Sequence, residues 1–363
     1  MALHPLIGHQ SARRRLAQAH ATGTLPQVIL LSGAAGIGKQ RLALWLAQLV
    51  LCERSGQEPC GACRSCRLVG ALSHPDVHWF VPIPRPRASD PDKQVEEAAD
   101  ALAQVLEERR AQPLYSPTDG MAIHGMATAR LLQQRAALTS VEGGRRVFII
   151  GEADRLVPQE SSPDAANALL KLLEEPPPGS IFVLTTTEPR RLLPTVRSRA
   201  VPLRLGRLTD GEVEEFLRVA QQPALNAGEL KQRVAQAEGS IGQAIASADQ
   251  AGKAWLAAQQ WLEAVLEGPG PATERALRQQ PWAARGEFTA MLDALSETLS
   301  EAVRGVVGQQ PRREVPAPLL RYRGPDQLLQ AIERVADARE AAWGNVNPQL
   351  LLAVLGEDLA EVL

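Results

Sequence analysis

The chain lacks several features that mark other classes of protein. Its 39 lysine and arginine residues nearly balance 41 aspartate and glutamate residues, so the net charge of -2 provides no general attraction to nucleic acid. No run of about 18 apolar residues that could form a membrane helix is present, and residues 1–10 lack the charged and apolar regions of a signal peptide. We therefore expect a cytoplasmic, multidomain protein whose contacts with DNA, if it has any, are local.

Cysteine is scarce, but its placement is informative. The four cysteines of the chain lie within fifteen residues, at Cys52, Cys60, Cys63 and Cys66. Clustered thiols in a reducing compartment favour metal binding over disulfides, and two C-x-x-C steps suit tetrahedral zinc. Four sulfurs complete the coordination shell, so we expect a structural zinc site, with an iron–sulfur cluster as the alternative. The nearby His74 and His78 are interpreted as surface or packing residues rather than ligands.

A glycine-rich loop follows a short apolar run at residues 28–31 and precedes a segment with leucines at helical spacing, residues 41–51. The order of strand, loop and helix is that of a phosphate-binding loop, in which backbone N–H groups and a lysine bind phosphates. The nucleotide-binding residues expected from this pattern are Gly33, Gly36, Gly38 and Lys39. Glycines kept for backbone geometry alone are the alternative, so the binding of ATP or ADP stays open.

The residues that hold magnesium in such a loop are missing. Gln40 stands where the motif has a serine or threonine, and Gly151 stands where the strand at residues 147–150 should be followed by an aspartate. Glu152 could still polarise a water molecule, but without a metal the charge of the transferred phosphoryl group is poorly stabilised. The sequence therefore predicts that this chain does not hydrolyse ATP by itself.

Apolar runs and prolines divide the chain into three parts. Runs at residues 147–150 and 181–185 predict buried parallel strands, so residues 1–205 are expected to form an α/β domain. The proline-rich residues 82–120, with a charged helix from about 94 to 110, are interpreted as an insertion. Strand signals end near Leu208, which predicts helical domains over residues 206–249 and 250–363, the latter with a break at residues 309–318.

Three motifs carry a resemblance to a known family. They are the segments Asn167–Pro177, Thr185–Pro189 and Arg197–Arg199. Together with the cysteine cluster they resemble the clamp-loader family of AAA+ proteins, which includes the γ/τ and delta-prime subunits of the bacterial replicative polymerase. The resemblance implies an α/β P-loop (AAA+) domain over residues 1–205 with an inserted zinc module at 52–66. A small helical lid domain (206–249) and a C-terminal all-α collar domain (250–363) would follow.

The resemblance also implies roles for particular residues. Arg199 matches the family's arginine that is presented in trans to the γ-phosphate on a neighbouring subunit, although Ala200 replaces the cysteine that follows it. Thr187 matches a sensor position after the third strand, and Arg197 is a weaker candidate for the arginine. Without the resemblance, Arg199 would be read as a surface or salt-bridging residue.

Departures from the pattern indicate which type of subunit the chain resembles. Besides Gln40 and Gly151, Gly242 stands where a motor subunit has a sensor arginine. The pattern resembles delta-prime, which implies a stator that supplies an arginine without hydrolysing ATP itself, as part of a DNA polymerase holoenzyme. The implied partners are the gamma/tau and delta subunits, the sliding clamp and primed DNA. The alternatives are a gamma/tau-like ATPase and a zinc-ribbon nucleic-acid-binding protein with a vestigial P-loop.

Overall fold

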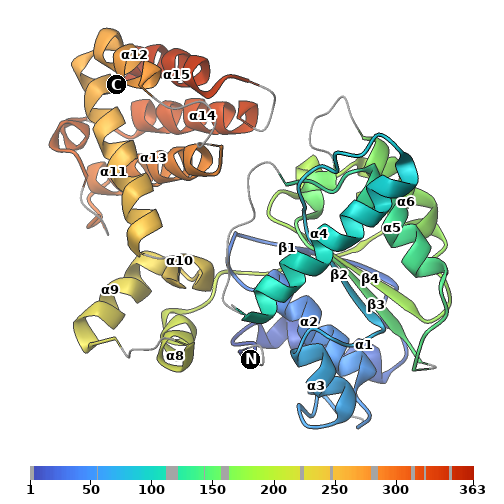
Figure 1. Ribbon diagram of the computed structural model, residues 1–363. Helices are drawn as coiled ribbons and strands as arrows, with labels where there is room; N and C mark the ends of the chain where they lie inside the picture. The colour runs from blue at the N-terminus through green and yellow to red at the C-terminus, as the bar shows by residue number, and fades with distance from the viewer. Residues whose placement is uncertain are drawn as a thin grey trace. The chain divides into compact units, whose positions relative to one another are not determined.

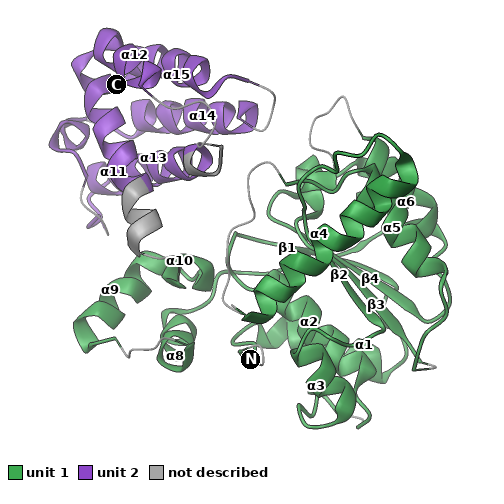
Figure 2. Ribbon diagram, viewed as in Figure 1, with its two compact units in different colours: residues 1–118, 122–245 green, residues 119–121, 246–363 purple. Residues whose placement is uncertain are grey.

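The computed structural model describes residues 4–54, 56–111, 122–142, 144–156, 163–220, 225–245, 248–278, 285–311, 315–322, 324–342 and 346–363. The chain divides into two compact units (Figure 2), unit 1 with residues 1–118 and 122–245, and unit 2 with residues 119–121 and 246–363. In the described part of the chain, no helix has the length and apolar character needed to cross a membrane.

Unit 1 is built on a five-stranded parallel sheet in the order β2-β3-β4-β1-β5 (Figure 1). The strands are β1 (Val28–Ser32), β2 (Val77–Phe80), β3 (Arg146–Ile150), β4 (Ser180–Thr186) and β5 (Val201–Arg204). Every residue of β1, β3 and β4 is buried, which explains why the middle of each strand is a continuous apolar run rather than an alternating pattern. Parallel pairing places the carboxyl ends of the strands at one edge of the sheet, next to the glycine loop after β1.

Helices cover this sheet in two groups whose members contact one another, and the strands run between the groups in Figure 1. The first group is α1 (Gln10–Ala21), α2 (Lys39–Leu51) and α3 (Arg64–Gly70). The second is α4 (Pro91–Ala111), α5 (Met126–Ala137) and α6 (Asp164–Glu174). The short elements η1 (Ala153–Leu156), η2 (Pro189–Arg191) and α7 (Pro194–Arg197) complete this part of unit 1. A single hydrophobic core joins the sheet to both groups.

Three further helices of unit 1 have a small core of their own. They are α8 (Asp210–Ala220), α9 (Ala227–Ala237) and α10 (Ile241–Ile245). A capping box begins α8, in which Thr209 Oγ1 accepts from the Glu212 N–H at 3.3 Å and the Glu212 carboxylate accepts from the Thr209 N–H at 2.8 Å. A second capping box, formed by Asn226 and Glu229, begins α9.

Helices joined by short connections make up the described residues of unit 2. Its elements are α11 (Ala248–Glu267), α12 (Pro269–Leu277), α13 (Arg285–Val306), η3 (Ala317–Arg321), α14 (Asp326–Ala341) and α15 (Pro348–Val362). Their core contains Trp261, Phe288 and many leucines and alanines. The expected break near residues 309–318 is found, since α13 ends at Val306 and α14 begins at Asp326. The boundaries expected from the sequence, at residues 205 and 249, fall between the cores of the sheet, of α8–α10 and of unit 2. The division into three domains stays a proposal.

The predicted strands at residues 28–31, 147–150 and 181–185 are confirmed as β1, β3 and β4, each extended by one or two residues. The two outer strands, β2 and β5, were not predicted. The segment read as an insertion contains α4, whose Val95, Ala98 and Leu102 are buried in the main core. Residues 112–120 of that segment lie outside the described residues.

The centre of this core depends on stacked aromatic rings. Phe148 and Phe182, both fully buried, stack at a centroid distance of 4.9 Å, and the His78 ring stacks on Phe148 at 4.8 Å. We predict that Phe182→Ala lowers the free energy of unfolding by roughly 3–5 kcal/mol, because it leaves a cavity between strands that cannot collapse. Thermal and urea denaturation measure this. Leu138→Ala, at a side chain that is 64% exposed, is the control, and equal effects of the two substitutions would contradict the prediction.

Candidate functional site

The glycine loop after β1 has the backbone shape of a phosphate-binding loop. Gly33, Gly36 and Gly38 all have positive φ values, of 151°, 70° and 98°, which residues with a Cβ rarely adopt. Gly38 is followed at once by α2, a helix of 13 residues, so the loop ends at a helix N-terminus. Backbone N–H groups at such a position favour an anion.

Lys39 lies inside this loop. Its ammonium group donates to the carbonyl oxygens of Gly33 at 2.9 Å and Ala34 at 2.6 Å. An ammonium has three N–H donors, so two are used by the loop and one is left for a ligand. Lys39 is 9% exposed, and this burial lowers its pKa to about 8, although the carboxylates of Asp154 and Glu152 oppose the shift. The two hydrogen bonds therefore hold the lysine in place, and it loses its proton at a lower pH than an ordinary lysine.

The two residues expected in place of magnesium ligands lie against each other. A Cβ added to Gly151 would be 2.8 Å from Gln40 Oε1 and 2.9 Å from the Gln40 Cδ and Nε2 atoms. Cβ atoms do not approach other heavy atoms so closely, so the Gln40 amide occupies the space in front of Gly151. The positions of the missing hydroxyl and the missing aspartate are thus adjacent in space, as the sequence motifs imply.

Glu152 follows Gly151 in a left-handed conformation, with φ of 51°. Its carboxylate lies 2.9 Å from Arg155 Nε, and its backbone N–H donates to Thr185 Oγ1 at 3.1 Å. Arg155 is buried and also donates to the Ala122 carbonyl at 2.8 Å. The ion pair holds the Glu152 carboxylate against Arg155, which does not favour a role for Glu152 in positioning a water molecule.

The threonines at the end of β4 have different surroundings. Thr187, expected at a sensor position, is exposed one residue beyond the strand. Thr186 is buried and donates to Asp154 Oδ1 at 2.6 Å. Burial raises the pKa of Asp154, while the hydrogen bond from Thr186 opposes the shift. The sensor role of Thr187 stays a prediction, and the sequence did not indicate the buried contact of Thr186 with Asp154.

Helix α10 closes one side of the loop. Ser240 Oγ donates to the Ala35 carbonyl at 2.9 Å, and the Gly242 N–H donates to the Gly36 carbonyl at 2.9 Å. A Cβ on Gly36 would lie 2.8 Å from the Gly242 Cα, so the two glycines allow a direct backbone contact. Gly242, which stands where a motor subunit has a sensor arginine, therefore allows α10 to pack directly against the glycine loop.

A histidine that the sequence patterns did not mark also contacts the loop. The His9 ring Nε2 lies 2.6 Å from the Ile37 carbonyl oxygen, and His9 has a φ of 55°. His9 and Ser240, which lie near the two ends of unit 1 in sequence, therefore both contact the loop. His9 stands in no motif that would have identified it, whereas Ser240 lies two residues before Gly242, in the segment where a motor subunit has its sensor arginine.

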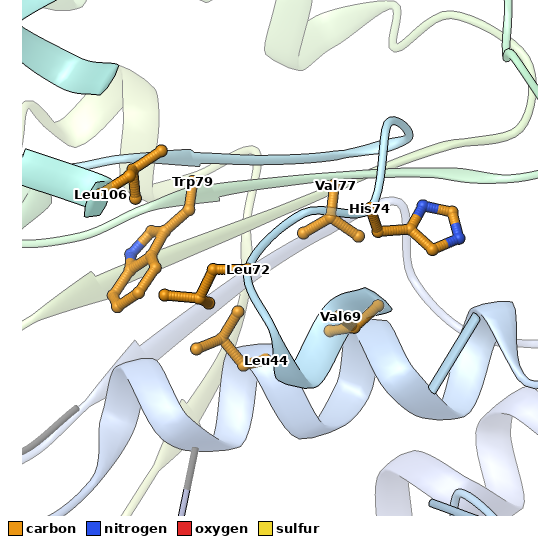
Figure 3. A pocket seen from close by; sticks show the side chains of 7 residues that line it. All are labelled: Leu44, Val69, Leu72, His74, Val77, Trp79 and Leu106. Carbon is orange, nitrogen blue, oxygen red and sulfur yellow. The ribbon is translucent and has the colours of Figure 1, made fainter. Parts of the chain in front are cut away.

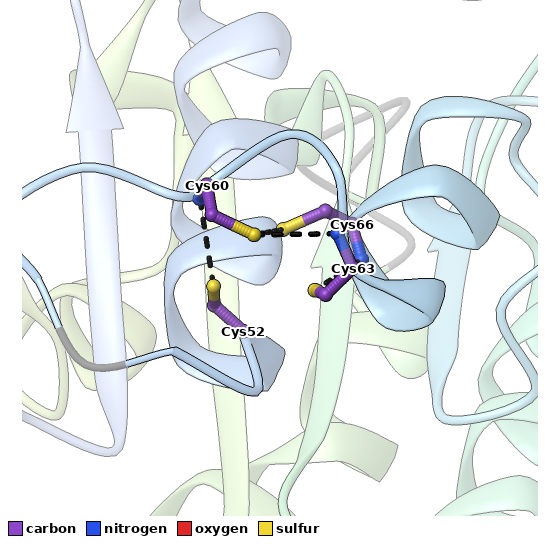
Figure 4. Close-up of side chains that lie close together, drawn as sticks. All are labelled: Cys52, Cys60, Cys63 and Cys66. Carbon is purple, nitrogen blue, oxygen red and sulfur yellow. Dashed lines mark hydrogen bonds between the residues drawn. The ribbon is translucent and has the colours of Figure 1, made fainter.

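The four cysteines form a cluster that can hold a metal ion (Figure 4). Their sulfur atoms all lie within 4.8 Å of one another, and the sulfurs of Cys60 and Cys66 are 4.0 Å apart. A zinc ion with four Zn–S bonds of 2.3 Å requires sulfur separations of about 3.8 Å, so the cluster fits tetrahedral zinc. Gly61, with φ of 66°, makes the turn between Cys60 and Cys63, and Cys63 caps the start of α3.

The surroundings of the cluster favour the thiolate of Cys60 and disfavour that of Cys66. Backbone N–H groups of Ala62 and Cys63 lower the pKa of Cys60 to about 6, whereas burial raises the pKa of Cys66. The Cys66 N–H donates to the Cys63 sulfur at 3.4 Å, which is the kind of outer hydrogen bond that orients metal ligands. A bound cation would deprotonate all four thiols. His74 is buried and His78 stacks on Phe148, so both are packing residues.

Arg199 lies on unit 1 just after α7, far along the chain from the loop. Its side chain is 27% exposed and forms an ion pair with Glu174, at the end of α6. The Arg199 Nε–Glu174 Oε1 distance is 2.8 Å, and a second nitrogen, NH1, donates to the Thr195 carbonyl at 2.7 Å. Arg197, the weaker candidate, is exposed. The structure thus shows Arg199 in a salt bridge, the reading given without the family resemblance, and its partner Glu174, from the Asn167–Pro177 motif, was not predicted.

A comparison with protein-family models decides the family. The model described as "DNA polymerase III, delta subunit" matches residues 8–209, more than half of the chain. The chain belongs to the DNA polymerase III delta subunit family. This agrees with its resemblance to clamp-loader proteins of the delta-prime type, which is confirmed.

Individual relatives carry related names. DNA polymerase III subunit delta′ of Bacillus subtilis is 31% identical over 193 residues, covering 53% of this chain and 46% of the relative. Subunit gamma/tau of Mycobacterium bovis is 30% identical over 203 residues, covering 55% of this chain and 28% of the relative. This chain spans about half the length of the delta′ relative, and less of gamma/tau. A solved gamma subunit-related protein of Thermotoga maritima is 12% identical with a TM-score of 0.40, covering 95% of this chain and 99% of its own.

The cysteine cluster leads to a prediction about metal content. The purified chain should contain about one zinc ion per chain, and Cys63→Ser should lose it and lower the melting temperature, because a structural zinc site contributes directly to folding. Elemental analysis measures the zinc content, and thermal unfolding followed with a thiol-specific dye measures the melting temperature. His74→Ala is the matched control, since His74 is near in sequence but outside the cluster, and its zinc content should be unchanged. A metal-free native chain would refute the prediction.

The burial of Lys39 leads to a prediction about pH. A phosphate is attracted by the protonated lysine, and the folded-state pKa is lowered to about 8. The affinity of the loop for ADP should therefore fall as pH rises above 8, well before a lysine with the ordinary pKa of 10.5 would lose its proton. Titrations with fluorescent ADP between neutral and alkaline pH test this. A constant affinity throughout that range would show that Lys39 keeps its proton.

Proposed function

We propose that this chain is a delta-prime-like stator subunit of the DNA polymerase III clamp loader. In this role it supplies Arg199 in trans to a nucleotide held by a neighbouring ATPase subunit while the sliding clamp is loaded onto primed DNA. The chain would assist hydrolysis without performing it. Membership of the DNA polymerase III delta subunit family supports the general assignment, and the arginine role is our own inference.

The observation that carries the proposal is a contrast between two parts of unit 1. At the loop, the Gln40 amide fills the space beside Gly151, so a metal would have neither the hydroxyl nor the carboxylate that normally hold it. Arg199, in contrast, is partly exposed, and its contacts with Glu174, Thr195 and Ser198 lie at the surface. A surface ion pair contributes about 0–1 kcal/mol, so a phosphate can readily compete with Glu174 for the guanidinium.

The other parts of the chain fit this role as further proposals. Helices α8–α10 would be the lid, α11–α15 the collar that holds the subunit in its ring, and the cysteine cluster a structural zinc module. The partners would be gamma/tau and delta subunits, with the sliding clamp and primed DNA as ligands of the whole assembly, and the location would be cytoplasmic. Relatives named subunits delta′ and gamma/tau support the choice of assembly.

The alternative of a gamma/tau-like ATPase predicts magnesium-dependent hydrolysis by this chain alone. The packing of Gln40 against Gly151 and the ion pair of Glu152 with Arg155 support the stator over this alternative. A zinc-ribbon nucleic-acid-binding protein would bind DNA tightly as an isolated chain, with a strong dependence on salt. Measuring both properties on the isolated chain separates the three functions.

The decisive substitution is Arg199→Ala in a reconstituted loader. An arginine donated in trans can increase the hydrolysis rate by about 10³- to 10⁵-fold, so the neighbouring site that Arg199 faces should nearly stop turning over. The measurement is single-turnover ATP hydrolysis in the presence of clamp and primed DNA, with assembly checked by gel filtration.

Two matched variants control for this result. Arg197→Ala removes an exposed arginine two residues away and should leave hydrolysis unchanged. Glu174→Gln frees the Arg199 guanidinium from its ion pair and should preserve hydrolysis or increase it, because the pair holds Arg199 away from a ligand. Normal hydrolysis by an assembled Arg199→Ala loader would remove Arg199 from catalysis.

A further inference from the structure

Both backbone polar groups of Gly151 are hydrogen-bonded, which resists movement of this residue away from Gln40. Its N–H donates to the Phe80 carbonyl at 2.8 Å, and its carbonyl lies 2.7 Å from the His124 ring Nε2. His124 is fully buried, which lowers its pKa to about 4, so the ring is neutral and must donate this hydrogen bond. The backbone of residue 151 therefore cannot shift to make room for a larger side chain beside Gln40.

The Gln40 amide is fixed from the other side. Its Oε1 accepts from the Trp79 indole N–H at 3.0 Å and from the Arg109 guanidinium at 3.2 Å. The guanidinium also stacks over the Trp79 ring, at 4.5 Å from its centroid. The Trp79 ring lies among apolar side chains that include Leu72 and Leu106 (Figure 3), and Trp79 is only 7% exposed. We refer to Gln40, Trp79 and Arg109 as the Gln40 cluster.

The Gln40 cluster changes the electrostatics of the loop. A divalent cation at this position would find no carboxylate from residue 151 and would meet the guanidinium of Arg109 instead. Like charges at short range repel strongly where water is partly excluded. At the same time Arg109 adds a positive charge beside Gln40, the residue that follows Lys39, at a loop whose N–H groups already favour anions.

We propose that the loop binds a nucleoside diphosphate or triphosphate without a divalent metal ion. The Gln40 cluster occupies the space in which the metal would lie and supplies a positive charge in its place. The glycine loop and Lys39 bind the phosphates, and Arg109 contributes charge at the side where magnesium would otherwise sit. This inference does not depend on Arg199, because it concerns binding to this chain alone.

The test is ADP binding to the full chain, measured by calorimetry with excess Mg²⁺ and again with EDTA. The affinity in EDTA should equal or exceed that in Mg²⁺, because free ADP carries more negative charge than its metal complex. Lys39→Ala should abolish binding, which locates it at the loop. Binding that is tighter in Mg²⁺ by about tenfold or more, or no ADP binding in either condition, would overturn the proposal.

The contribution of Arg109 has a matched control on the same helix. Arg109→Gln should weaken ADP binding in EDTA by about tenfold, the size of one charge-assisted interaction. Arg110→Gln removes the next guanidinium, which donates to the Leu72 carbonyl at 2.6 Å, and should have little effect. Equal losses in both variants would show that Arg109 supplies no specific charge to the loop.

The steric part of the proposal predicts a dependence between two substitutions. Gly151→Asp alone should lower the melting temperature, because its side chain overlaps with Gln40, and Gln40→Thr alone should leave ADP binding independent of metal. Only the double variant should bind Mn²⁺ with ADP, as followed by electron paramagnetic resonance. Metal binding by Gly151→Asp alone would contradict the steric argument.

Discussion

Parallel pairing of β1, β3 and β4 is the constraint on which the rest of unit 1 depends. It brings the carboxyl ends of three buried strands to one edge, where the glycine loop, Gly151 and the threonines after β4 meet. Open parallel sheets bind ligands at this edge, because loops there are free to vary while the strands are fixed by burial. Substitutions at the edge, such as Gln40 and Gly151, can therefore remove metal chemistry without disturbing the fold.

Much of this arrangement could be predicted from local sequence. The strands β1, β3 and β4 are short apolar runs, Thr209 and Glu212 form a capping box over three residues, and the cysteine spacing determines a four-ligand cluster. The outer strands were missed because β2 contains His78 and two aromatic residues, whereas β5 contains Pro202 and has exposed residues. Neither pattern resembles a buried parallel strand.

Long-range contacts between side chains could not be predicted. Gln40, Trp79 and Arg109 are 30 to 69 residues apart and come from three elements, and Glu174 is 25 residues from Arg199. No periodicity or spacing rule connects such residues, so the motif showed what was missing at the metal position but not what replaced it. The packing of the Gln40 amide against Gly151 explains why the two residues occur together, since a side chain at residue 151 would overlap with Gln40.

The central claim is a division of labour, in which the chain donates an arginine and does not use its own loop for hydrolysis. The most direct test is a loader in which this chain alone carries Lys39→Ala, compared with one in which it alone carries Arg199→Ala. The account predicts that stimulated ATP hydrolysis is unchanged by the first substitution and falls sharply with the second. A fall with Lys39→Ala equal to that with Arg199→Ala, in intact assemblies, would contradict it.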